Sequence, residues 1–261
     1  MADGPVVVFD SGLGGLSVVR AVRELMPELG LAYVADDAAF PYGDMEAGAL
    51  RGHILRVMED VIARFSPTAV VIACNTASTL VLEPLRAVHR PPFVGTVPAI
   101  KPAAERSGTG AFSVLATPAT IERDYTRELI TQFAAGCHVR LVGAPDLARM
   151  AEAHLLGRPI DRERLGEQIA PCFYEAEGRR SDIVVLACTH YPFLTGPMED
   201  VAPWPVTWLD PAPAIARRLK QVIGGRDCPT RGAEPVLLTS GRVPDSAQCR
   251  VFAAYGFSAA G

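Results

Sequence analysis

Two short segments of this chain read almost alike: residues 70–74, Val-Val-Ile-Ala-Cys, and residues 184–188, Val-Val-Leu-Ala-Cys. Each is a β-branched apolar run that ends at a cysteine and is followed by polar residues. Uninterrupted apolar runs of this length are typical of strands buried on both faces of a parallel sheet. Open parallel sheets bind their ligands beyond the carboxyl ends of the strands. The repeat therefore predicts two thiols, Cys74 and Cys188, at matching functional positions of two similar units.

The rest of the chain alternates between strand and helix patterns, which predicts an α/β fold with mainly parallel sheets. The expected strands are 6–9, 31–35, 69–73, 93–96, 111–116, 138–142, the run before Cys188, 206–209 and 235–239. The expected helices are 16–26, 46–65, 75–89, 99–106, 120–134, 161–177, one that ends at 223, and 247–255.

Two similar α/β domains, facing each other, follow from the repeat. The prolines around Val97-Pro98 mark a crossing between them, and the elements after residue 208 are too few to fold alone. We therefore expect a discontinuous first domain, 1–97 plus 209–261, and a second domain, 98–208.

The charge and apolar content of the chain argue against two classes of binding partner, nucleic acids and membranes. A net charge of −4 offers no basic patch, so no nucleic acid is expected. Apolar stretches fall short of the roughly 20 residues that span a bilayer, so no membrane is expected. The first residues lack the basic region of a secretory signal, and the six cysteines lack disulfide spacing. We expect reduced thiols in a cytoplasmic protein.

Three alternatives compete for the paired thiols. A buried core cysteine is the ordinary alternative, but Cys74 lies at a strand end and a helix begins at once, which stabilises a thiolate. A zinc site with His190 is weakly supported, because no Cys-x-x-Cys or His-x-x-x-His spacing occurs. A redox pair would place its thiols two residues apart. The other cysteines, 137, 172, 228 and 249, are expected to be structural or exposed.

A glycine-rich segment, residues 10–15, follows the first expected strand. It matches neither the dinucleotide-binding pattern nor the P-loop, which needs a lysine. It is either a cradle for a small anion at a helix N-terminus or a plain tight turn.

Four motifs in order resemble the glutamate racemase family of the cofactor-independent aspartate/glutamate racemase superfamily. They are residues 10–15, Asp-Ser-Gly-Leu-Gly-Gly; 41–43, Pro-Tyr-Gly; 74–77, Cys-Asn-Thr-Ala; and 188–192, Cys-Thr-His-Tyr-Pro. The resemblance extends from residue 6 to Thr-Ser-Gly at 239–241. It departs from the family pattern in 143–151, where Ala144-Pro145 replaces Cys-Pro.

The resemblance implies interconversion of L- and D-glutamate without a cofactor or metal, in a cleft between the domains. D-glutamate would supply peptidoglycan synthesis, and with it cell wall biogenesis and cell shape. The implied catalytic residues are Cys74, Cys188, Asp10, His190, Asp36 and Glu152. The implied substrate-binding residues are Asp10, Ser11, Tyr42, Gly43, Asn75, Thr76, Thr117, Thr120, Thr189 and His190. The family pattern assigns Cys74 to D-glutamate and Cys188 to L-glutamate.

The chemistry of the residues agrees. The chain has only two lysines, Lys101 and Lys220, and neither has the setting of a pyridoxal phosphate lysine. Without such an electron sink, a carbanion must be stabilised by hydrogen bonds and by protonation on the opposite face. Inversion then needs an acid and a base on opposite sides, which two thiols supply.

Two rivals remain open. One is an aspartate racemase or a related isomerase or decarboxylase of the same superfamily. The other is a two-lobed protein that binds a small anion without chemistry, although such a protein needs no paired thiols. The expected partner is the small-molecule substrate, glutamate, and a homodimer is an assembly that the residues leave open.

Overall fold

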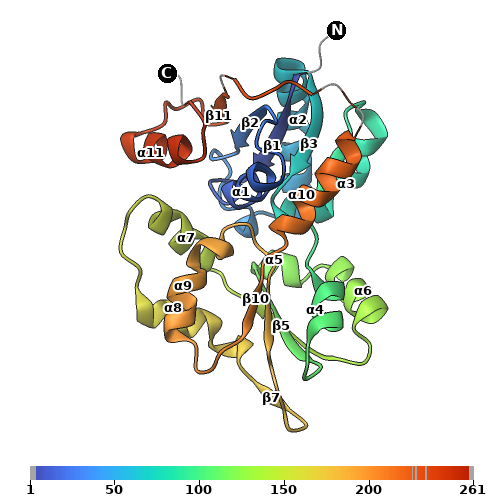
Figure 1. Cartoon of the computed structure of the whole chain (residues 1–261), viewed down its shortest axis with the longest axis vertical. Coiled ribbons are helices and arrows are strands. Elements are labelled where there is room, and N and C mark those ends of the chain that lie inside the picture. Colours follow the sequence, from blue (N-terminus) through green and yellow to red (C-terminus); the bar gives the residue numbers. More distant parts are fainter. Residues whose placement is uncertain (1–3, 225, 227, 233, 259–261) are drawn as a thin grey trace. The chain divides into compact units, whose positions relative to one another are not determined.

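The computed structural model describes residues 4–224, 226, 228–232 and 234–258 and contains two parallel β-sheets with flanking helices (Figure 1). The predicted α/β class with mainly parallel sheets is confirmed. The chain divides into two compact units, one combining the chain up to Thr96 with the chain from Ala212 onward, the other spanning Val97–Pro211. The predicted boundaries fall within three residues of this division. That each unit is an independent domain stays a prediction.

The first unit is built on a five-stranded sheet in the order β11-β2-β1-β3-β4. Its strands are β1 (Gly4–Asp10), β2 (Leu31–Ala35), β3 (Pro67–Ile72), β4 (Phe93–Gly95) and β11 (Val236–Leu238). Its helices are α1 (Leu16–Leu25), η1 (Tyr42–Asp44), α2 (Ala47–Phe65), α3 (Asn75–Val88), α10 (Ala212–Ile223) and α11 (Ser246–Ala254). Every pairing is parallel, and β11 joins β2, so the end of the chain returns to this sheet.

The apolar runs of the sequence form the centre of this sheet. All the side chains of β3 and most of those of β1 are buried, as expected for strands covered on both faces. The N-cap of α2 is Glu46, whose side chain accepts the N–H groups of Gly48 and Ala49. It ends at Ser66, which adopts a left-handed conformation (φ 42°) before Pro67. The predicted helix end at residue 65 is confirmed.

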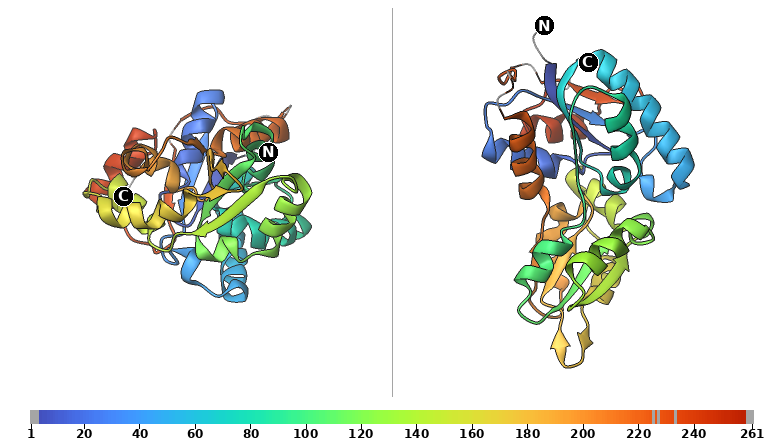
Figure 2. Two further views of the ribbon diagram at one scale, coloured as in Figure 1. Left: turned by 90° about the horizontal axis from the view of Figure 1, so that it is seen from below. Right: turned by 90° about the vertical axis from the view of Figure 1, so that its right-hand side faces the viewer.

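The second unit is built on a four-stranded parallel sheet in the order β10-β9-β5-β6. Its strands are β5 (Ala111–Ala116), β6 (His138–Gly143), β9 (Ile183–Leu186) and β10 (Thr207–Leu209), with a separate hairpin, β7 (Glu175–Ala176) and β8 (Arg179–Arg180). Its helices are α4 (Ile100–Arg106), α5 (Pro118–Ile121), α6 (Asp124–Phe133), α7 (Leu147–Leu155), α8 (Arg162–Ile169), η2 (Ala170–Cys172), η3 (Tyr191–Leu194) and α9 (Thr195–Val201). The hairpin extends beyond the end of the sheet (Figure 2, right).

Several expected elements of the second unit were wrong. The helix predicted for 161–177 ends at Ile169, because Pro171 lacks a backbone N–H and a 3-10 turn follows. Glu177 and Gly178 then adopt positive φ values, which form the hairpin turn. The helix predicted for 120–134 is two helices, and α7 and α9 were not predicted.

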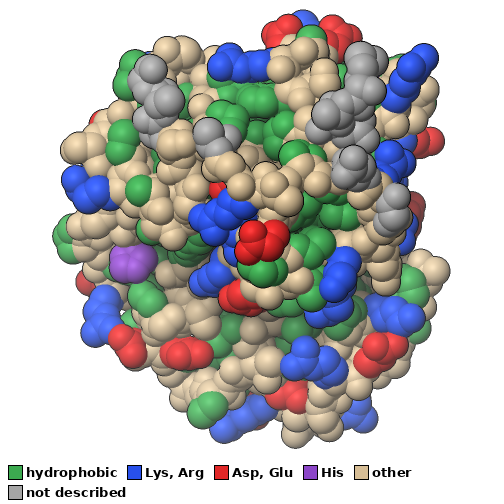
Figure 3. Space-filling view, turned by 45° about the horizontal axis from the view of Figure 1, so that its top comes forward, with side chains coloured by type: hydrophobic (Ala, Val, Ile, Leu, Met, Phe, Trp, Pro, Cys, Tyr) green, Lys and Arg blue, Asp and Glu red, His purple; other side chains and the backbone are tan. Residues whose placement is uncertain are grey.

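On the face shown in Figure 3, basic and acidic side chains are interspersed rather than gathered by sign. Within the described part of the chain, no helix has the length and apolar character needed to cross a membrane.

The glycine-rich segment is a tightly packed turn. Tyr33 donates its hydroxyl hydrogen to the carbonyl of Gly12 at 2.7 Å. A Cβ atom at Gly15 would lie 2.8 Å from Cβ of Asp10 and 2.9 Å from the Tyr33 hydroxyl oxygen. Close packing of α1 on the sheet therefore requires glycine here.

We expect Gly15→Ala to destabilise the protein by about 1–3 kcal/mol, the usual effect of overpacking. Gly52→Ala is the matched control, because a Cβ there would meet only an Arg56 nitrogen at 3.6 Å. That change should stabilise α2 by about 0.5–1 kcal/mol. Denaturant unfolding measures both, and equal effects would contradict the packing argument.

Candidate active site

In the first unit, three expected site residues lie at the carboxyl ends of neighbouring strands. Asp10 ends β1, Asp36 directly follows β2, and Cys74 follows β3 after one residue. Both carboxylates are fully buried, and Cys74 is 7% exposed. Asp10 accepts the backbone N–H of Gly12 at 3.0 Å, within the glycine-rich turn. The parallel sheet therefore gathers these groups at one edge, as the sequence predicted for ligand-binding residues.

Cys74 is the N-cap of α3, and Asn75 and Thr76 form the first turn. The helix dipole at this end favours a thiolate. Asn75 is 2% exposed, and neither its amide nitrogen nor its amide oxygen has a hydrogen-bond partner among the described residues. A buried unpartnered amide is destabilising by about 1–3 kcal/mol, so it indicates a place kept for a ligand.

Tyr42 joins this group through its hydroxyl, which donates to Oδ2 of Asp36. Burial, and then the negative charges of Asp36, Cys74 and Asp10, raise the pKa of Tyr42 well above its ordinary value. Tyr42 therefore contacts Asp36 directly and is influenced electrostatically by Cys74 and Asp10. Its hydroxyl hydrogen is engaged by Asp36, and Tyr42 and Gly43 begin η1. Their role in substrate binding stays a prediction.

Ser11 and Thr76, also expected to bind substrate, are both buried at this edge of the sheet. Ser11 follows β1 directly and Thr76 lies in the first turn of α3. The first unit therefore brings together all eight of its expected site residues: Asp10, Ser11, Asp36, Tyr42, Gly43, Cys74, Asn75 and Thr76.

In the second unit, Cys188 follows β9 and is 8% exposed. Its Sγ lies 3.9 Å from Nδ1 of His190, and Nε2 of His190 lies 2.7 Å from Oε2 of Glu152 on α7. Burial opposes protonation of His190, but hydrogen bonds and charge interactions with Cys188 and Glu152 raise its pKa well above the ordinary value. A histidine placed between a thiol and a carboxylate is an arrangement that can activate a cysteine.

Two threonines expected near the substrate lie beside this thiol's strand. Thr117 follows β5, the neighbour of β9, and its hydroxyl oxygen is 2.9 Å from that of Thr120. Thr189 is buried directly after Cys188.

Tyr191 in the same motif supports the segment that departs from the family pattern. Its hydroxyl donates to the carbonyl of Ala144 at 3.3 Å, just before α7. Burial, followed by the charges of Cys188 and Cys172, raises the pKa of Tyr191 well above its usual value. The altered segment thus still presents Glu152 to His190.

Cys172 is a third buried cysteine, and it was not expected to belong to the site. Cys172 is fully buried, and burial raises the pKa of its thiol to about 12. Among the described residues, no group of three or more His, Cys, Asp or Glu side chains is placed to hold a metal ion.

Sequence reasoning missed two residues that contact Asp36. His53, on α2, places Nε2 at 2.6 Å from Oδ2 of Asp36, and Thr239 donates its hydroxyl hydrogen to Oδ1. Thr239 lies in the motif at 239–241 and could have been found there. A single histidine within a helix carries no comparable signal.

We expect Glu152→Gln to lower the pKa of His190, because it removes one of the groups that raise it. NMR titration of the histidine ring measures this directly. The control is Glu167→Gln, which removes an exposed carboxylate beside Arg164 in the same unit. An unchanged His190 titration in Glu152→Gln would contradict the proposed pairing.

The raised pKa of His190 also fixes the pH dependence of stability. Its contribution is fully present below the unfolded pKa of about 6.5 and is lost as pH rises through the higher folded value. The difference in unfolding free energy between the wild type and Glu152→Gln should therefore shrink as pH rises.

The comparisons with known proteins agree with the residues above. A family model described as Asp/Glu/Hydantoin racemase matches residues 16–219. The glutamate racemase of Brucella canis is 54% identical over 255 residues, covering 97% of this chain and 92% of that protein. The glutamate racemase of Brucella anthropi is 55% identical over 258 residues, covering 98% and 93%.

Solved structures show the same likeness. Escherichia coli glutamate racemase, in complex with L-glutamate and the activator UDP-MurNAc-ala, matches with a TM-score of 0.90 at 35% identity, covering 97% of this chain and 96% of that one. The isoform RacE1 of Bacillus anthracis shares the fold, with a TM-score of 0.83 at 23% identity over 99% and 97% of the two chains. The chain belongs to the Asp/Glu/hydantoin racemase family.

Proposed function

We propose that this protein is a cofactor-independent glutamate racemase that works with two thiols. The observation that carries the proposal is a cysteine at the end of a buried parallel strand in each unit, each beside a group that stabilises a thiolate. Cys74 lies at the N-terminus of α3, and Cys188 lies beside His190, which in turn contacts Glu152. Identity of 54% to a glutamate racemase over nearly the whole chain supports glutamate as the substrate.

In the proposed reaction, one thiolate removes the α-proton of glutamate and the other thiol delivers a proton to the opposite face of the same carbon. The Cα–H bond breaks as an S–H bond forms, and the second S–H bond breaks as the new Cα–H bond forms. Each turnover therefore exchanges thiol and thiolate between Cys74 and Cys188. His190 holds a proton at Nδ1 toward Cys188, and Glu152 orients it.

The substrate groups find complementary partners. The amide of Asn75, the hydroxyls of Ser11, Thr76 and Thr189, and the N–H groups that begin η1 are suited to the carboxylates of glutamate. Asp10 is suited to its ammonium group. The Thr117–Thr120 pair supplies further hydroxyls from the second unit.

We propose that the protein acts in the cytoplasm and supplies D-glutamate for peptidoglycan synthesis. Its activity would thereby serve cell wall biogenesis and cell shape. A homodimer stays a prediction.

The purified protein should convert L-glutamate and D-glutamate to the same equal mixture, with EDTA present and without added pyridoxal phosphate. Circular dichroism of the substrate follows the reaction. Loss of activity in EDTA, or dependence on pyridoxal phosphate, would count against the mechanism.

Aspartate should react at least about a hundredfold less efficiently than glutamate, because a shorter side chain leaves polar groups of the site unpaired. Comparable efficiency on aspartate would favour a broad-specificity racemase, and binding without racemisation would favour the binding protein.

Replacement of the thiols one at a time tests their roles. Cys74→Ser and Cys188→Ser should each abolish racemisation and leave the fold intact, since a serine hydroxyl does not ionise at neutral pH. Elimination of HCl from 3-chloroglutamate needs only the base on one face of the α-carbon. It therefore reports on each thiol separately. Cys74→Ser should retain elimination from the L-enantiomer and Cys188→Ser from the D-enantiomer, measured as released 2-oxoglutarate. Cys172→Ser is the control and should keep racemisation. Loss of the same enantiomer in both variants would refute the two-base reading.

A further inference from the structure

The carboxylate of Asp36 is held by three donors from three parts of the first unit. Tyr42 of η1 and His53 of α2 both reach Oδ2, and Thr239, just after β11, reaches Oδ1. Asp36 is fully buried, whereas the His53 side chain is 26% exposed. A buried carboxylate is stable only when its oxygens accept hydrogen bonds or face a cation. These three contacts are therefore what holds Asp36 in place.

The contact with Asp36 determines which ring nitrogen of His53 carries a hydrogen. An ionised carboxylate only accepts hydrogen bonds, so Nε2 of His53 carries the proton at 2.6 Å from Oδ2. This oxygen thus receives two donors at once, one from His53 and one from Tyr42. The position of the Tyr42 hydroxyl is set by an oxygen that His53 also anchors.

Tyr42 in turn begins η1, the turn whose backbone N–H groups are proposed to bind substrate. It also lies close enough to Cys74 and Asp10 to respond to their charges. A path of direct contacts therefore leads from His53 through Asp36 and Tyr42 to the substrate-binding turn.

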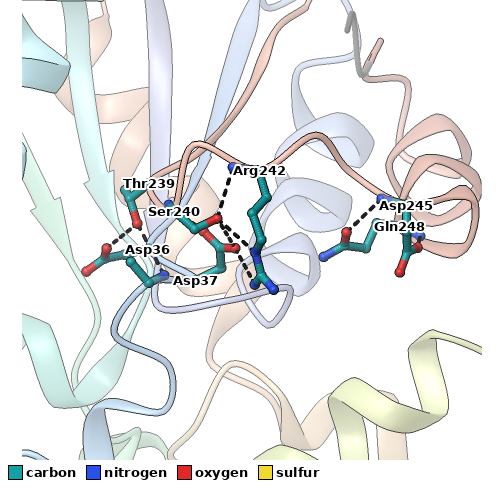
Figure 4. Close-up of polar contacts among 8 residues, drawn as sticks. Asp36, Asp37, Thr239, Ser240, Arg242, Asp245 and Gln248 are labelled. Carbon is teal, nitrogen blue, oxygen red and sulfur yellow. Dashed lines mark hydrogen bonds and ion pairs between the residues drawn. The ribbon is translucent and has the colours of Figure 1, made fainter.

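A second set of contacts ties down the adjoining loop without His53. Asp37 accepts the backbone N–H and the hydroxyl of Ser240 and pairs with Arg242 at 3.0 Å (Figure 4). Burial works against it, but hydrogen bonds from Ser240 and Arg242 lower the pKa of Asp37. Because this tether remains, loss of His53 should loosen the turn locally rather than unfold the unit.

We propose that His53 is a positioning residue of the active site, which fixes Asp36 and through it the Tyr42–Gly43 turn that binds glutamate. The role rests on the proposed racemase function. It predicts weaker substrate binding when His53 is lost, with the reacting thiols unchanged.

His53→Leu should raise KM for both enantiomers about tenfold, the order expected for losing a hydrogen bond to a charged group, and change kcat less than about threefold. His53→Gln places a donor nitrogen near the same position and should restore most of the lost affinity. His89→Leu is the matched control, because His89 also lies at a helix of this unit but contacts Phe93 rather than Asp36. Thr239→Val removes the donor to Oδ1 and should give the same rise in KM.

The equilibrium constant between mirror images is one, so kcat/KM must fall by the same factor in both directions. Only its division between KM and kcat reports on positioning. Amide hydrogen exchange across residues 36–45 gives a readout that needs no activity, and it should speed up in His53→Leu but not in His89→Leu.

Unchanged exchange and unchanged KM in His53→Leu would overturn the proposal, as would a fall in kcat alone or a failure of His53→Gln to restore affinity. If His53→Leu does not fold, Thr239→Val decides by the same measurements. A wild-type protein that does not racemise glutamate would instead refute the proposed function, while the exchange measurement would still test the link from His53 to the turn.

Discussion

In both units, ionisable side chains are buried at the carboxyl ends of parallel strands, two aspartates and a cysteine in the first unit and a cysteine in the second. The surrounding structure compensates for the negative charge that these groups carry when they are ionised. A buried anion persists only with hydrogen-bond donors or a cation beside it. In the first unit, Asp36 draws in Tyr42, His53 and Thr239, so η1, α2 and the segment after β11 converge on one carboxylate. In the second unit, His190 lies between Cys188 and Glu152, which ties α7 to the loop after β9.

The two thiols are stabilised by different means, which bears on the proposed reaction. Cys74 caps a helix of 14 residues, whose N-terminus favours a negative charge without any proton of its own. Cys188 faces an imidazole that carries a proton and can hold it close to the sulfur. A racemase exchanges thiol and thiolate between its two bases in every turnover. If one device stabilised its thiolate far more than the other, the enzyme would accumulate in one protonation form and react slowly with one enantiomer. The two devices should therefore be close in strength although they differ in kind.

The sequence predicted the elements that depend on local patterns. Apolar runs located the strands, and the position of a cysteine at the end of β3 and of β9 located both thiols. Helix α7 was missed although it has a helical pattern of its own, since it buries Leu147, Ala148 and Ala151 on one face. The predicted helix 161–177 ran into β7 because the turn of this hairpin depends on positive φ values at Glu177 and Gly178, which the sequence pattern does not reveal. His53 could not be found because its partner, Asp36, lies in another element, and only the packing of α2 brings the two together.

The unpartnered amide of Asn75 separates the proposed substrate from a plain anion. An amide presents a donor nitrogen and an acceptor oxygen, and here both are buried without a partner in the described part of the chain. A simple anion could accept from the nitrogen but would leave the oxygen unsatisfied. An α-amino acid carries a carboxylate and an ammonium group on the same carbon, so one molecule can accept from the nitrogen and donate to the oxygen. Asn75 and Cys74 both lie at the N-terminus of α3, so a ligand bound to that amide would lie at the end of the sheet where the proposed reaction needs its thiol.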